Sequence, residues 1–186
     1  MRPDIDSPPT LEWVDDHVRI IDQTLLPAEV LVVGLRTVDD VVDAIGRLAV
    51  RGAPAIGACG AFGVVVALDE ALRAGGTAAR DEVAGSIERI ADARPTAVNL
   101  RWAVDRVVAA MDGLGTGHER RVAALAEAIA IFDEDRAACD AIGRHGADEL
   151  AEARTILTHC NAGRLATTGI GTALGVVYGK AMAGQP

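Results

Sequence analysis

The segment Arg51-Gly52-Ala53-Pro54 places a guanidinium group directly before a stretch that the sequence predicts to be helical. The first N–H groups of a helix have no partner inside the helix, so such an end binds anions readily. Gly52 would let a ligand approach the backbone closely, because glycine has no side chain. The pattern favours a phosphate site, and the alternative is an ordinary junction between two helices with a surface arginine.

Arg94 repeats this arrangement in the loop before another predicted helix, which Thr96 is placed to cap. Two such arginines could clamp one phosphate, because a guanidinium group pairs with two of its oxygens at once. The alternative for Arg94, taken by itself, is a solvated loop side chain.

The third candidate is Cys160, in the loop that follows the short apolar run Thr155–Thr158. That run predicts a buried strand, and ligands of open α/β sheets bind beyond the carboxyl ends of the strands. A thiol there, beside a histidine and ahead of a further helix, could be stabilised as a thiolate. The alternative is a small buried hydrophobe, the role that apolar helical surroundings favour for Cys59 and Cys139.

The elements that must position these groups begin with strands. Leu11–Val14 and Val18–Ile21 flank a polar turn and predict a hairpin, and Val30–Leu35 predicts a third strand. Thr37 then caps a helix with apolar residues at every third or fourth position, which continues until Gly52 breaks it.

The next predicted helix, from Pro54 to about Ala74, is apolar on nearly all sides, which is typical of a helix buried on all sides. Four more helices are predicted, with a capping box at Thr116 and Glu119 before the third of them. Their expected ranges are about Ala78–Ala91, Ala97–Met111, Glu119–Glu152 and Thr168–Lys180.

This order predicts an α/β protein with three parts. Residues 1–36 form a small β region, residues 37–152 a helical domain, and residues 153–186 the opening strand, loop and helix of a Rossmann-like domain that is truncated. One strand and one helix cannot complete a parallel sheet, because the strands of such a sheet are covered on both faces.

Composition narrows the function classes. With 186 residues and a net charge of −9, the chain lacks the basic surface that nucleic acid requires. Met1–Pro9 contains acidic residues and prolines where a secretory signal would have an apolar core, so we expect no such signal. Glycines and a proline interrupt the longest uncharged stretch, Gly52–Leu68, so we expect no membrane span. Three isolated cysteines argue against disulfides or a zinc site, which favours a cytoplasmic location.

Three longer segments closely resemble methylthioribose-1-phosphate isomerases, which are similar to the regulatory subunits of eukaryotic initiation factor 2B. They are Arg51–Gly57 (RGAPAIG), Arg94–Trp102 (RPTAVNLRW) and Ile156–Gly175 (ILTHCNAGRLATTGIGTALG), and the opening LEWVDDHVRIIDQTLLP extends the resemblance to about Leu11–Val177.

The resemblance implies a cytoplasmic homodimer of methionine salvage, with a helical N-terminal domain and a Rossmann-like C-terminal domain. Such an enzyme interconverts 5-methylthioribose 1-phosphate and 5-methylthioribulose 1-phosphate, an aldose–ketose isomerisation, without a metal or organic cofactor.

The resemblance also implies roles for matched residues. Arg51, Gly52, Ala53 and Arg94 would bind substrate, with Arg51 on its phosphate. Cys160 would stabilise the transition state or relay a proton, by a phosphoenolate or by a hydride shift. The same pocket would be lined by Asn161, Gly163, Thr167 and Thr168.

Two departures from the family pattern matter. The general acid of the family is an aspartate that would fall after Pro186, so we expect the 186-residue chain alone to be inactive. Arg164 stands where the family usually has a small residue, and we expect its charge to change the pKa of Cys160 or to block the pocket. The alternatives are an isomerase of ribose 1,5-bisphosphate or another sugar 1-phosphate, and a non-catalytic module like the initiation-factor subunits.

Overall fold

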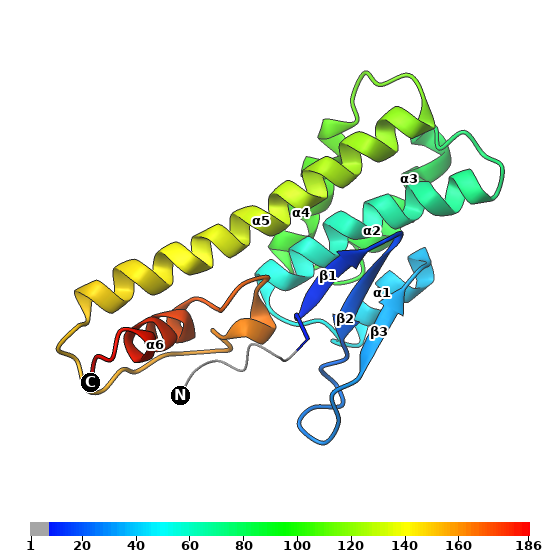
Figure 1. The fold of residues 1–186 in the computed structure, drawn as a ribbon. Helices are drawn as coiled ribbons and strands as arrows, with labels where there is room; N and C mark the ends of the chain where they lie inside the picture. Colours follow the sequence, from blue (N-terminus) through cyan, green and yellow to red (C-terminus); the bar gives the residue numbers. More distant parts are fainter. Residues whose placement is uncertain (1–7) are drawn as a thin grey trace.

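A computed structural model describes residues 8–186, and Figure 1 shows a bundle of helices beside a small sheet. The first seven residues, which include most of the segment judged against a secretory signal, lie outside the described part. Strands β1 (Leu11–Val14), β2 (His17–Ile21) and β3 (Val32–Leu35) form an antiparallel sheet in the order β1-β2-β3. The predicted hairpin and third strand are confirmed.

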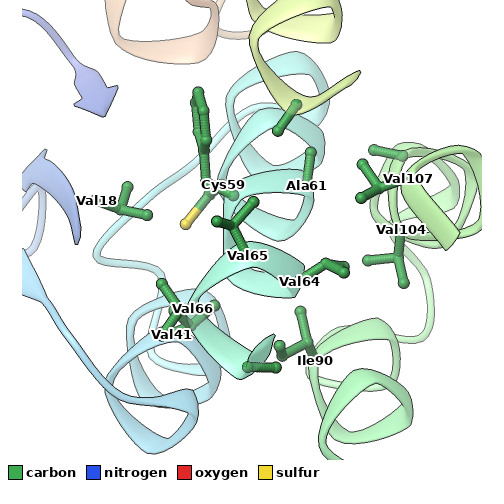
Figure 2. Packing of buried hydrophobic residues seen from close by; sticks show 14 of the residues in the cluster. Val18, Val41, Cys59, Ala61, Val64, Val65, Val66, Ile90, Val104 and Val107 are labelled. Atoms are coloured by element: carbon green, nitrogen blue, oxygen red, sulfur yellow. The ribbon is translucent and has the colours of Figure 1, made fainter. Parts of the chain in front are cut away.

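Helix α2 (Ala53–Arg73) forms the axis of the core, because every residue from Ala55 to Leu68 is buried. Figure 2 shows its valines packed against side chains of β2, α1 (Val38–Gly46), α3 (Arg80–Ala91) and α4 (Val98–Ala110). By length and composition α2 could cross a membrane, but 78% of its most apolar stretch is buried inside the fold. The prediction of a helix covered on all sides is confirmed.

Two predicted helix caps are present and one is not. Thr37 closes a capping box with Asp40 at the start of α1, and Thr116 closes one with Glu119 at the start of α5 (Gly117–Glu149). Both boxes satisfy N–H groups that a helix leaves unpaired. The predicted Thr96 cap is wrong, because α4 begins one residue later, after Ala97, and its first turn accepts no side-chain cap.

The C-terminal segment differs from the expectation. Residues 155–158 form no strand, and Leu157 is 97% exposed. A strand requires a neighbour for its backbone hydrogen bonds, and no described residue forms a ladder with this segment. A short 3₁₀ turn (Arg164–Ala166) and then α6 (Ala173–Met182) follow, so the last helix begins five residues later than predicted.

Helix α5 is continuous through Gly143 and Gly146. Figure 1 shows α6 lying along the C-terminal half of this helix. A Cβ atom on Gly179 of α6 would lie 2.7 Å from the carbonyl oxygen of Gly143, and one on Gly146 would lie 2.4 Å from a methyl group of Val176. Glycines at the crossing therefore allow the two helices to pack closely against each other.

We expect Gly179→Ala to destabilise the packing of α6 by about 1–3 kcal/mol, because its methyl group would meet backbone that cannot rotate away. Faster labelling of the buried Cys139 thiol, which lies next to this crossing, would report the opening. Gly85→Ala in α3 is the matched control: nothing lies within 4 Å of its Cβ position, so alanine should stabilise the helix by about 0.5–1 kcal/mol. Equal effects of the two changes would contradict this view of the crossing.

Candidate active site

Arg51 lies in the exposed connection between α1 and α2. Its Nε donates to the carbonyl oxygen of Leu48 at 3.2 Å, and within residues 8–186 no carboxylate forms an ion pair with it. The helix that follows has no side-chain cap, and Pro54 in its first turn has no N–H group. An exposed guanidinium group therefore lies beside a helix start that carries no side-chain cap, a combination that favours anions.

Gly52 makes the closest approach between this helix end and the C-terminal segment. Its φ is +84°, a left-handed conformation that favours glycine, and a Cβ atom would lie 2.4 Å from the Cα of Ala166. No side chain could fit between the two backbones. The structure therefore places the Arg51 loop against the segment that follows Cys160, as Figure 1 shows at the start of α2.

The Arg94 loop lies at the same end of the helical bundle. A Cβ atom on Gly57, one turn into α2, would lie 3.0 Å from the carbonyl oxygen of Asn99 in the first turn of α4. Ala93 is near the end of α1, since its carbonyl oxygen lies 3.9 Å from the Cβ position of Gly46. Arg94 is half-buried, so both predicted phosphate ligands come from neighbouring helix starts.

Cys160 and Asn161 are exposed in the loop between α5 and the 3₁₀ turn. The φ of Cys160 is +64°, a left-handed conformation that costs a non-glycine residue about 1–3 kcal/mol. No described hydrogen bond joins Cys160 to Arg51 or Arg94. The thiol is reachable from solvent, and its approach to the arginines stays a prediction.

The remaining predicted pocket residues serve as attachments. Gly163 is buried and forms a bridge with Gly171. Thr167 is also buried, and its hydroxyl donates to the carbonyl oxygen of Gly169. Thr168 donates from its N–H and its hydroxyl to the carboxylate of Asp135 in α5, at 2.7 and 2.8 Å. These contacts dock the segment, and a role in substrate binding stays a prediction for all three.

Arg164 extends toward the N-terminal strands. Its guanidinium group donates to the carbonyl oxygen of Pro8 at 2.7 Å, while its own carbonyl oxygen accepts from the hydroxyl of Thr10 at 2.9 Å. The departure from the family pattern thus joins the C-terminal segment to the start of β1. Its predicted effects on Cys160 stay untested.

Burial separates the three thiols. It raises the pKa of Cys59 to about 12, and it also raises the pKa of Cys139. Both therefore stay protonated and unreactive at neutral pH, as their apolar surroundings predict. Cys160 is the exposed thiol of the three.

Residues that the sequence analysis missed hold the segment in place. Gln23 and Thr10 are buried polar side chains that donate to the carbonyl oxygens of Leu165 and Arg164. The polar trio Asp22-Gln23-Thr24, which directly follows a buried strand, was the available signal, because polar groups at such a place require buried partners.

A cavity with a volume of about 850 Å³ has the predicted pocket residue Thr168 in its lining. Aromatic rings of β1, α2 and α5 line it together with Arg136 and Arg164, whereas Arg51, Arg94 and Cys160 do not. We place the candidate site at the Gly52–Ala166 contact, because the exposed Arg51 and the uncapped start of α2 lie there and an anion site needs such donors. Across residues 8–186, no group of three or more His, Cys, Asp or Glu side chains is arranged to hold a metal ion.

Together these features define a mostly helical α/β protein with a small antiparallel sheet, against which a C-terminal segment ending in α6 is docked. The chain belongs to the initiation factor 2 subunit family, whose model matches residues 49–184.

Curated relatives carry isomerase names. The chain is 45% identical over 177 residues to a 5-deoxyribose 1-phosphate isomerase of Moorella thermoacetica, covering 94% of this chain and 50% of that protein. It is 46% identical over 178 residues to a methylthioribose-1-phosphate isomerase of Geobacter metallireducens, covering 95% and 51%. The chain thus spans about half the length of the curated relatives it matches.

Two solved structures are equally similar in fold. The delta subunit of translation initiation factor eIF-2B from A. fulgidus has a TM-score of 0.82 and 37% identity, covering 96% of this chain and 52% of that one. The 5-methylthioribose 1-phosphate isomerase of Pyrococcus horikoshii OT3 has a TM-score of 0.82 and 34% identity, covering 97% and 51%. Both the mostly helical fold with its small sheet and the resemblance drawn from the motifs are confirmed.

Gly52→Ala tests the contact at the centre of the candidate site. We expect it to loosen residues 163–168 and to lower the free energy of unfolding by roughly 2–4 kcal/mol, because left-handed strain and overpacking add. Gly75→Ala is the control: its φ is +82° but nothing lies within 4 Å, so only the strain of about 1–2 kcal/mol should appear. Amide hydrogen exchange of residues 163–168 should rise in the first variant alone.

Asp22 gives the site a pH-dependent support. Burial acts to raise the pKa of its carboxyl, but hydrogen bonds from Thr24 and Arg47 outweigh it and hold the pKa below its ordinary value. A lowered pKa stabilises the fold above the unfolded value of about 3.9, and this contribution disappears as pH falls through the folded value.

We therefore expect Asp22→Asn to lower the free energy of unfolding by about 1–3 kcal/mol at pH 7, and this difference to shrink below about pH 4. Asp43, the exposed second partner of Arg47, provides the control, since Asp43→Asn should cost at most about 0.5 kcal/mol. A difference for Asp22→Asn that persists unchanged to pH 3 in urea titrations would contradict the assignment.

Proposed function

We propose that the native protein is an aldose–ketose isomerase acting on 5-methylthioribose 1-phosphate in methionine salvage, in the cytoplasm and as a homodimer. The observation that carries the proposal is the seating of Gly52 on Ala166, which joins the arginine-bearing start of α2 to the segment after Cys160. The names of the curated relatives and the three matched motifs support it.

The reaction conserves all atoms of the substrate. The bond between C1 and the ring oxygen breaks, the hydrogen on C2 moves to C1, and the proton of the C2 hydroxyl ends on the former ring oxygen. The phosphate ester at C1 persists throughout, so the same donors can hold it from substrate to product. Arg51 and Arg94, with the N–H groups of the α2 start, are the residues that we assign to it.

Cys160 is assigned to the reacting end of the sugar, where its thiol relays a proton or stabilises the transition state. The two routes that the resemblance leaves open predict different isotope outcomes. A hydride shift carries deuterium from C2 into the product, whereas a phosphoenolate exchanges it with solvent.

A second candidate substrate is 5-deoxyribose 1-phosphate, because a relative of 45% identity carries that name. Ribose 1,5-bisphosphate is a further alternative, since the arginines recognise the phosphate rather than the group at C5. Turnover of the three sugars side by side by the native polypeptide decides among them. A clear preference for either alternative would overturn the choice of the methylthio substrate.

A non-catalytic module is the alternative from another class, and the similarity to an eIF-2B subunit favours it. Absence of turnover with any sugar phosphate by the native polypeptide would support that view. The three-part division at residues 36 and 152 and the inactivity of the 186-residue chain alone stay predictions, and the same assay tests the inactivity.

We expect Cys160→Ser to lower kcat of the native polypeptide by roughly 10²–10⁴-fold, the usual contribution of a positioned proton-transfer group. Arg51→Ala should mainly raise KM, by roughly 10- to 100-fold, because hydrogen bonds to a charged phosphate are lost. Arg89→Ala, which removes an exposed ion pair between α3 and Asp39 of α1, serves as control and should leave both constants within twofold. Unchanged turnover in Cys160→Ser would contradict its role.

A further inference from the structure

Gln23 connects the two parts of the candidate site. It lies two residues after the end of β2 and is only 5% exposed. Its backbone N–H donates to the carbonyl oxygen of Ala49 at 2.9 Å, two residues before Arg51. Its side-chain Nε2 donates to the carbonyl oxygen of Leu165 at 2.8 Å, five residues after Cys160. One residue thus holds the chain on both sides of the site.

The position of Gln23 is itself fixed by its neighbours. The carboxylate of Asp22 accepts from the N–H and the hydroxyl of Thr24 at 3.0 and 2.6 Å, and from Arg47 at 2.7 Å. The N–H of Asp22 donates to the carbonyl oxygen of Leu31 at 2.8 Å. With its flanks held in this way, the amide of Gln23 can determine where the carbonyl of Leu165 lies.

Other contacts hold the same segment, since Arg164 donates to the carbonyl oxygen of Pro8 and Thr168 donates to Asp135. Thr10 donates to the carbonyl oxygen of Arg164, and Gly52 touches Ala166 without a polar bond. A buried amide that lost its acceptor would be left unsatisfied at a cost of about 1–3 kcal/mol, so the Gln23 bond resists opening. The placement of residues 164–166 against α2 therefore depends in part on the side chain of Gln23.

We propose that Gln23 is a positioning residue, which sets the distance between the phosphate held at Arg51 and the thiol of Cys160 without touching the substrate. The inference rests on the proposed function. Its physical reason is that proton transfer depends steeply on placement, and a displacement of about 1 Å far from the chemistry can lower the rate roughly 10²-fold.

The test uses the native polypeptide with Gln23→Met, which keeps the length of the side chain and removes the donor, and Gln23→Glu, which offers an acceptor instead. The matched control is Gln185→Met, at the other glutamine of the chain, whose side-chain oxygen has no hydrogen-bond partner among the described residues. We expect kcat of both Gln23 variants to fall roughly 10- to 100-fold with KM within about threefold, and the control to match the wild type.

Two readouts do not require turnover. Amide exchange across residues 163–168 should rise in the Gln23 variants, and inorganic phosphate should protect Cys160 from iodoacetamide less than it does in the wild type. Wild-type exchange and protection in the variants would overturn the proposal whether or not the protein is an isomerase. Raised exchange with unchanged kcat would overturn it too, since the bond would then serve stability alone.

Failure of the proposed function gives a different result. In that case the wild type converts none of the sugar phosphates, while the exchange and protection measurements still report whether Gln23 holds the two loops together. The combination of a kcat loss, a retained KM and lost phosphate protection, absent in Gln185→Met, supports the positioning role.

Discussion

The fold depends on the complete burial of α2. From Ala55 to Leu68 this helix offers no polar side chain on any face, so each face requires an apolar cover. Figure 2 shows how β2, α1, α3 and α4 supply that cover, and α5 closes the remaining side. Only the two ends of α2 can meet water, and the polar chemistry of this part of the molecule is therefore confined to them.

The N-terminal end of α2 is defined by the groups that are missing from its first turn. It has no capping side chain, and Pro54 removes one of its donors. Gly52 is the residue that allows a second backbone to lie directly on this end. Core packing and candidate chemistry are thus coupled, because the helix that organises the interior also presents its unpaired N–H groups where the C-terminal segment docks.

Local signals were sufficient for most of the helical part. The cap at Thr37, the capping box at Thr116 and the all-round apolar character of α2 each depend on residues close in sequence, so the sequence predicts them well. The strand expected at Thr155–Thr158 failed because a strand depends on a neighbour that no local pattern supplies.

The residues of the candidate site also fall into those that local motifs identify and those that depend on distant partners. The motifs identified Arg51, Arg94 and Cys160 by residue type and spacing. They did not identify Gln23 or Thr10, because the hydrogen-bond partners of these residues lie more than 140 positions away in the chain. Asp135 likewise acquires its role only when Thr168 docks on it, 33 positions further along the chain.

The uninterrupted course of α5 has a mechanical consequence. Its 33 residues extend for about 50 Å, with the bundle at one end and α6 at the other (Figure 1). A helix of this length behaves as a stiff lever, so a small tilt at the bundle becomes a displacement of several ångströms at α6. The hydrogen bonds that join residues 164–168 to the strands and to α5 restrain this movement.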